Sequence, residues 1–131
     1  MSTSILVAED DESVRDVIRR SLEQAGYSVC EAANGEEAIR ALDAVPFDLV
    51  ITDILMPERD GLETILYLRR SSPRTKVIAI SGAANDLFLT DAAGLGAARV
   101  LTKPFKPDEL LSLVAETLAS APDSGAVSPP S

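Results

Sequence analysis

Five polar side chains in this sequence stand directly after short apolar runs, and their types suit phosphate chemistry. The runs and the residues that follow them are 5–8 before Glu9 and Asp10, 48–52 before Asp53, 77–80 before Ser81, and 100–102 before Lys103. If the runs are neighbouring parallel strands, their carboxyl ends form one edge of a sheet, where open α/β sheets bind ligands. Three carboxylates, a hydroxyl and an ammonium at that edge suit a divalent cation together with a phosphoryl group.

The carboxylates predict a metal site. Glu9 and Asp10 precede an expected helix, and capping of that helix is the alternative explanation for them. Asp11 and the two residues after it suit capping equally well, which leaves Glu9 and Asp10 as hard oxygen ligands. With Asp53 added, the three carboxylates repel one another, and their pKa values are raised unless a cation is bound. Mg²⁺ is favoured over Ca²⁺ because too few protein oxygens are available for a closed cage.

The other side chains predict phosphoryl transfer. Asp53 could simply end a strand, but a carboxylate can also act as a nucleophile and form an acyl phosphate. Ser81 suits an ordinary turn, yet its hydroxyl could donate to a phosphoryl oxygen. Lone lysines are mostly solvated, but Pro104 holds Lys103 extended, so that the ammonium follows the line of the strand. For each residue taken alone, helix capping, a turn or a solvated surface position is the commoner explanation. Taken together, the five residues favour one phosphoryl-transfer site.

The periodicity of apolar residues predicts five strand and helix pairs. The expected strands cover residues 5–8, 27–33, 48–52, 76–80 and 98–102, and the expected helices cover 13–25, 36–45, 61–71, 86–94 and about 107–118. The helix at 86–94 has the weakest pattern. This alternation predicts an α/β fold, a doubly wound five-stranded parallel sheet with helices on both faces.

Composition limits the function classes. With 131 residues and a formal net charge of −9, the chain is expected to form one domain over residues 1–120, followed by a proline-rich disordered tail or linker at 121–131. No basic cluster supports nucleic-acid binding, and no apolar run approaches the roughly 20 residues of a membrane span. A cytoplasmic protein is expected, with Cys30 as a reduced core residue.

The segments around the five polar residues resemble the receiver domain of two-component response regulators, from about Ser4 to Leu118. The matching motifs are residues 5–12 for the first strand and acid pair, 48–57 with Asp60-Gly61 for the phosphoacceptor segment, Ser81-Gly82-Ala83 for the switch hydroxyl, and Lys103-Pro104-Phe105 for the lysine region. The resemblance implies a flavodoxin-like (βα)5 fold with strand order 2-1-3-4-5. It fits a chemotaxis-type single-domain regulator or an isolated N-terminal receiver.

The resemblance also implies a role for each site residue. Mg²⁺ would be held directly by Asp10, Asp53 and the Leu55 carbonyl, and by Glu9 through water. Asp53 would be the phosphoacceptor, Ser81 the switch hydroxyl and Lys103 the partner of the phosphoryl group. Two positions depart from the family pattern: Val100 stands where an aromatic residue is usual, and Glu9 where aspartate is commoner. Signal transmission is therefore expected to use the loop after Ser81 and the helix at 86–94.

The expected function is a phosphorelay switch. Because the chain has no histidine, the phosphoryl group must come from a histidine kinase or a histidine phosphotransfer protein. Phosphorylation would change the face made by the helix at 86–94, the fifth strand and the last helix, and so alter binding of a partner protein. The open alternative is a receiver cut from a longer regulator with an output domain, for example a DNA-binding one.

Two other functions are disfavoured by particular residues. An aspartyl phosphatase would need an acid two residues after Asp53, where this chain has Leu55. The protein is therefore not expected to be an enzyme, beyond its own phosphorylation and slow dephosphorylation. A flavin-binding electron carrier shares the topology, but the acidic residues 9–12 would repel the flavin phosphate.

Overall fold

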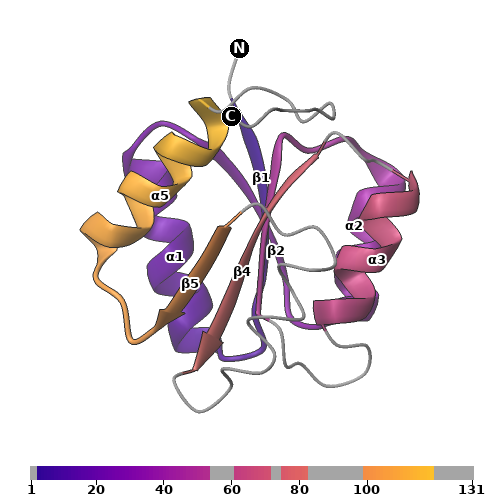
Figure 1. Ribbon diagram of the computed structural model, residues 1–131, viewed down its shortest axis with the longest axis horizontal. Coiled ribbons are helices and arrows are strands. Elements are labelled where there is room, and N and C mark those ends of the chain that lie inside the picture. The colour runs from indigo at the N-terminus through magenta and orange to yellow at the C-terminus, as the bar shows by residue number, and fades with distance from the viewer. Residues whose placement is uncertain (1–2, 54–60, 72–74, 83–98, 120–131) are drawn as a thin grey trace, which may run out of the picture.

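A computed structural model describes residues 3–53, 61–71, 75–82 and 99–119. Five parallel strands form one sheet in the order β2-β1-β3-β4-β5, as predicted. The strands are β1 (Ser4–Ala8), β2 (Ser28–Ala32), β3 (Leu49–Asp53), β4 (Lys76–Gly82) and β5 (Arg99–Lys103). The strand order reverses between β1 and β3, and both of these strands lie in the middle of the sheet. Figure 1 shows the strands between two pairs of helices.

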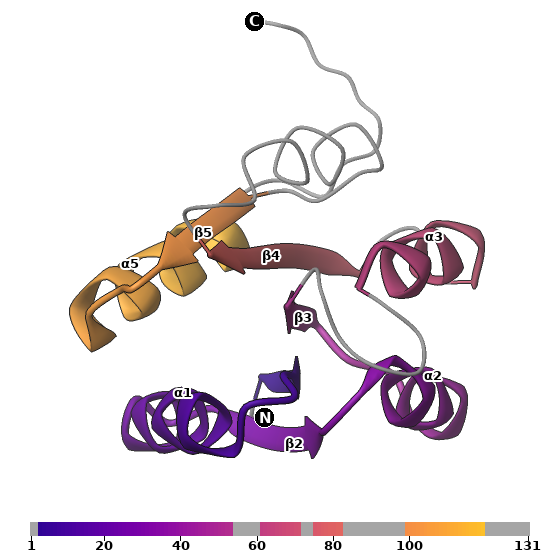
Figure 2. The same ribbon diagram turned by 90° about the horizontal axis from the view of Figure 1, so that it is seen from below.

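Helices cover both faces of the sheet (Figure 2). Helix α1 (Glu12–Gln24) and helix α5 (Pro107–Ala119) pack side by side on one face, while α2 (Gly35–Ala44) and α3 (Gly61–Ser71) pack on the other. Residues 54–60, the helix expected at 86–94 and the tail expected at 121–131 lie outside the described residues. Within the described ranges, no helix is long and apolar enough to cross a membrane.

Two apolar clusters hold these layers together, because successive side chains of a strand point to opposite faces. The cluster beneath α2 and α3 contains Leu6, Ala8, Ala32, Ala38, Val50, Leu68, Val77 and Ala79. The cluster beneath α1 and α5 contains Ile5, Val7, Ile18, Leu22, Leu49, Ile51, Ile78, Ile80, Leu101, Leu110 and Val114. Strands β1 and β3 are covered on both faces, which explains their continuous apolar runs.

The first two helices begin at residues that satisfy free amides. Asp11 is the N-cap of α1, and its Oδ1 accepts from the Val14 amide at 3.1 Å. Asn34 caps α2 in the same way, accepting from the Glu37 amide at 2.9 Å. These caps set where each helix starts, within one residue of the sequence expectation.

Two side chains expected in the core are exposed. Cys30 lies in β2, and its exposure follows from the position of that strand at the edge of the sheet, with a neighbouring strand on one side only. The three- and four-residue spacing of apolar residues in the expected helix at 13–25 predicts a buried Val17, but 48% of it is exposed. The buried residues of α1 are Ile18, Ser21 and Leu22, so the helix is rotated away from the face that periodicity suggested.

Candidate functional site

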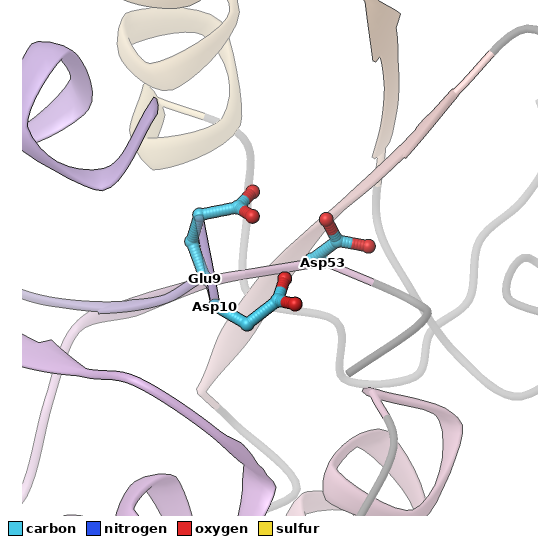
Figure 3. Close-up of side chains that lie close together, drawn as sticks. All are labelled: Glu9, Asp10 and Asp53. Atoms are coloured by element: carbon cyan, nitrogen blue, oxygen red, sulfur yellow. The ribbon is translucent and has the colours of Figure 1, made fainter. Parts of the chain in front are cut away.

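The carboxyl ends of two neighbouring strands bring three acidic side chains together. Glu9 and Asp10 follow β1, and Asp53 is the last residue of the neighbouring strand β3. Carboxylate oxygens of these three residues lie within 4.8 Å of one another. Figure 3 shows the three carboxyl groups turned toward the same space. Glu9 and Asp53 are buried, whereas Asp10 is exposed at the mouth of this acidic pocket.

Lys103 bridges the two buried carboxylates. Its Nζ lies 2.7 Å from Asp53 Oδ2 and 3.0 Å from Glu9 Oε1. Lys103 ends β5, which is two strands away from β3, so its side chain crosses the end of β4 to reach the acidic pocket. Its ammonium supplies positive charge beside the Asp53 carboxylate. The peptide bond from Lys103 to Pro104 is cis.

Burial dominates the electrostatics of Glu9. It raises the pKa of Glu9 from 4.5 to about 7; the Asp11 amide and Lys103 oppose the rise, and the Asp53 charge adds to it. Burial lowers the pKa of Lys103, but its hydrogen bonds to Asp53 and Glu9 outweigh burial, so the net pKa is raised. Glu9 can therefore gain a proton near neutral pH, while Lys103 stays charged.

Glu9 also accepts a hydrogen bond at the start of α1. One side chain can therefore support the helix start and still face the metal site. Its Oε2 accepts from the Asp11 amide at 3.0 Å, while its Oε1 faces Lys103. Asp11 in turn caps the helix. The extra methylene of glutamate, compared with aspartate, lets one carboxylate reach both the turn and the lysine.

The spacing of polar residues in the expected helix at 13–25 predicts Arg15 on the outer face, but the structure buries most of its side chain. Its Nη1 donates to the Glu9 carbonyl at 2.7 Å and its Nε donates to Glu31 Oε1 at 3.1 Å. Side chains in a helix lean toward its N-terminus. A basic residue in the first turns of a helix that starts beside an acidic pocket is a signal that sequence reasoning could have used.

Of the predicted site residues, Ser81 lies partly and Leu55 wholly outside the described residues. Ser81 lies in β4, in register with Thr102 of β5, which places its main chain at the edge that carries the acidic pocket. The Ser81 side chain and the whole of Leu55 lie outside the described residues. Val100 is partly buried and packs against the cluster beneath α2 and α3.

The donor set of the acidic pocket fits Mg²⁺. Carboxylate oxygens are the hard ligands that this ion prefers, and a pocket with few protein ligands leaves room for water and a phosphate oxygen. One ammonium does not neutralise three carboxylates, so a cation would relieve the remaining repulsion. A nucleophilic carboxylate flanked by a lysine and a cation site can accept a phosphoryl group.

Fold and site together define a doubly wound α/β protein with an acidic pocket at the strand-order switch point. The family model for the response regulator receiver domain matches residues 5–115. The chain belongs to this family.

Individual relatives agree with the family. The chain is 38% identical over 117 residues to the response regulator receiver protein CpdR of Brucella abortus, covering 89% of this chain and 98% of CpdR. It is 39% identical over 129 residues to the response regulator MprA of Mycolicibacterium vanbaalenii, covering 96% of this chain and 55% of MprA. The chain thus spans about half the length of MprA.

Solved structures support the fold. A CheY-like response regulator receiver domain protein from Methanospirillum hungatei superposes with a TM-score of 0.86 at 29% identity. The superposition covers 90% of this chain and 94% of that one. The predicted fold class and family are therefore confirmed.

Proposed function

We propose that Asp53 accepts a phosphoryl group from the phosphohistidine of a histidine kinase or histidine phosphotransfer protein. The observation that carries this proposal is the placement of Asp53 within 2.7 Å of the Lys103 ammonium and beside the Glu9 and Asp10 carboxylates. This arrangement offers a nucleophilic oxygen, a fixed positive charge and a cation site in one pocket. Those are the parts that phosphoryl transfer to a carboxylate requires.

In the proposed step, an Asp53 oxygen attacks phosphorus in line with the imidazole nitrogen of the donor. An O–P bond forms, the P–N bond breaks, and its electron pair stays on the nitrogen, which takes a proton from water. Lys103 moves from a carboxylate to a phosphoryl oxygen and offsets the new negative charge. No acid stands at position 55 to activate water, so the acyl phosphate is hydrolysed slowly and the protein turns over no outside substrate.

Mg²⁺ belongs to this proposal as the cofactor. Asp10 and Asp53 would hold the ion directly, with the Leu55 carbonyl, and Glu9 would act through water. When bound, the ion neutralises charge on the transferring phosphoryl oxygens. The Glu9 carboxylate has a second task in the pocket, because it keeps Lys103 beside Asp53.

An apolar groove beside Lys103 is proposed as the docking surface for the protein donor. The groove holds about 400 Å³ and is lined by Ser13, Val14, Val17, Lys103, Pro104 and Phe105. Any donor must bring its phosphorus to Asp53, so its surface must touch residues that border the acidic pocket. Val17 lines this groove and is half exposed. Its side chain could thus be buried against an apolar side chain of the donor.

The output of the switch is proposed to be a change in partner binding. A Ser81 hydroxyl drawn to the phosphoryl group would shift the face that the helix expected at 86–94 would make with β5 and α5, and so bias two packings of the fold. The partner is a separate protein or a fused output domain. We propose that the protein acts in the cytoplasm, and that this chain makes no direct contact with nucleic acid or membrane.

The test is a mass measurement after incubation with MgCl₂ and acetyl phosphate, a small-molecule phosphodonor. Wild-type protein is expected to gain the mass of one phosphoryl group, and the variant Asp53→Asn is expected to gain none. An Asp43→Asn variant is the matched control, because Asp43 is an aspartate of α2, outside the acidic pocket. A mass gain that persists in Asp53→Asn would refute the assignment of the phosphoacceptor.

The relative MprA favours a second arrangement, in which the receiver is one part of a longer protein. MprA is nearly twice as long as the segment that aligns with this chain, so the same switch can form one part of a longer regulator. The mass of the natural gene product, measured after immunoprecipitation, decides between a free receiver and a receiver fused to an output domain.

A further inference from the structure

The geometry points to Arg15 as a positioning residue of the acidic pocket, which holds the Glu9 carbonyl and thereby fixes the turn that carries Asp10 toward Asp53. This inference rests on the proposed function, because the position of Asp10 matters for a pocket that binds Mg²⁺ and accepts a phosphoryl group. Arg15 touches no reacting atom, and its effect passes through the main chain.

The guanidinium of Arg15 connects three elements. Its Nη1 donates to the carbonyl oxygen of Glu9 at 2.7 Å, and its Nε lies 3.1 Å from Glu31 Oε1 in β2. Only 16% of the Arg15 side chain is exposed, so the group is held between α1 and the sheet. The planar fork of arginine can make both contacts at once, which a single ammonium cannot reproduce with the same geometry.

The Glu9 main chain is consequently held on both sides. Its amide donates to the Ala32 carbonyl at 3.0 Å, which extends the pairing of β1 with β2 by one residue. Its carbonyl accepts from Arg15. That carbonyl belongs to the planar peptide unit joining Glu9 to Asp10, so the hydrogen bond from Arg15 orients the plane from which Asp10 projects.

Asp10 depends on this main-chain support. Its side chain is exposed, and within the described ranges no hydrogen bond or ion pair to its carboxylate is present. The direction of the carboxylate toward Asp53 therefore comes from the turn at Glu9 and Asp10. Groups that orient metal ligands affect metal affinity strongly even though they do not touch the ion.

A purely structural tie between α1 and β2 is the competing explanation for Arg15. That tie does not require Arg15, because Arg19 also pairs with Glu31, with Nε 3.2 Å from Oε2. Ion pairs of partly exposed side chains also contribute little to stability. The contact with the Glu9 carbonyl distinguishes Arg15 from the other arginines described in α1.

The experiment compares Arg15→Ala, Arg15→Lys and the control Arg20→Ala in MgCl₂ titrations followed by NMR shifts of the Asp10 and Asp53 amides. Arg20 lies on the same helix, is 69% exposed and pairs with Asp16, so the control removes the same charge. Arg15→Ala is expected to weaken Mg²⁺ binding by about tenfold. Arg15→Lys is expected to recover part of this loss, and Arg20→Ala to bind as wild type does.

Two further readouts separate positioning from loss of structure. Hydrogen exchange of the Asp10 amide in metal-free Arg15→Ala is expected to be faster than in wild type, with no change in the middle of β3. Phosphorylation by acetyl phosphate is expected to need more Mg²⁺ for half-saturation, with a nearly normal rate at saturating Mg²⁺. A saturating rate that falls while Mg²⁺ affinity stays normal would overturn the inference.

The outcomes also separate this inference from the proposed function. Equal Mg²⁺ affinities in Arg15→Ala and Arg20→Ala overturn the role of Arg15 alone. Tight binding by wild type without a phosphoryl group on Asp53 overturns the proposed function, and the comparison of affinities still decides the role of Arg15. Absence of Mg²⁺ binding by the wild type overturns both.

Discussion

The ammonium of Lys103 lies 2.7 Å from Asp53 Oδ2, although 50 positions separate the two residues in the chain. The same ammonium lies 3.0 Å from Glu9 Oε1. Lys103 thus joins the ends of three segments, β1, β3 and β5, at the point where the phosphoryl group is proposed to bind. Removal of this one charge should affect both stability and chemistry.

The variant Lys103→Met keeps the apolar stem and removes the charge. In metal-free protein at pH 8, we expect the free energy of unfolding to fall by about 2 kcal/mol, less than for a fully buried pair because 27% of the lysine side chain is exposed. The loss arises because Glu9 and Asp53 remain without a cation. Urea denaturation measures it.

A double-mutant cycle checks the cause. In a Glu9→Gln background, the effect of Lys103→Met is expected to be clearly smaller, since one of the two repelling carboxylates is gone. An identical loss in both backgrounds would contradict the coupling of Lys103 to Glu9.

The pH dependence of stability should carry the signature of Glu9. Its pKa is about 7 in the folded protein against 4.5 as the ordinary value, so between these pH values the folded state binds more protons than the unfolded state. Stability therefore falls as the pH rises through this window, by at most about 3 kcal/mol, and levels off above it. Metal-free wild type and Glu9→Gln are compared by urea denaturation from pH 4 to pH 9. Curves with the same slope between pH 4.5 and 7 would argue against Glu9 as the source.

Mg²⁺ should stabilise the protein through the acidic pocket. At 100 times the dissociation constant, a ligand that binds only the folded state adds about 2.7 kcal/mol. The increase in melting temperature should be larger at pH 8 than at pH 6, because the ligands must be deprotonated, and EDTA should reverse it.

The variant Asp10→Asn separates repulsion from metal binding. Without Mg²⁺ it is expected to be at least as stable as wild type, because one of three clustered negative charges is removed. With Mg²⁺ it is expected to gain less stability than wild type. Equal gains in both proteins would place the ion elsewhere.

The variant Val17→Glu tests whether a protein donor docks in the groove beside Lys103. Val17→Glu introduces a charge into the groove beside Lys103. Phosphotransfer from a phosphohistidine protein is expected to slow by about tenfold or more, because a charge buried at an interface costs binding energy. Phosphorylation by acetyl phosphate should stay unchanged.

Val45→Glu is the matched control for this experiment. Val45 is also half exposed, at 50%, but it lies at the end of α2 on the opposite face of the sheet. Both substitutions are at exposed positions and should change stability little. Equal slowing by the two variants would contradict a donor surface at the groove.

Local sequence signals were sufficient for most of the fold. The strands β1, β3 and β4 are short apolar runs that both clusters bury, and the sequence predicted each of them within two residues. Cys30 and Val17 were misplaced for one common reason. Apolar character alone does not tell which side of an edge strand or helix another element covers.

By itself, the sequence determined the alternation of strands and helices, the family motifs, and the polar residues at the strand ends. These features depend on neighbouring positions, so periodicity and chain breaks reveal them. Only the tertiary structure decided that Lys103 contacts Glu9 as well as Asp53, and that Arg15 turns back to the Glu9 carbonyl. Such contacts depend on ångström-scale distances that the packing of helices on the sheet sets, and apolar periodicity alone does not determine them.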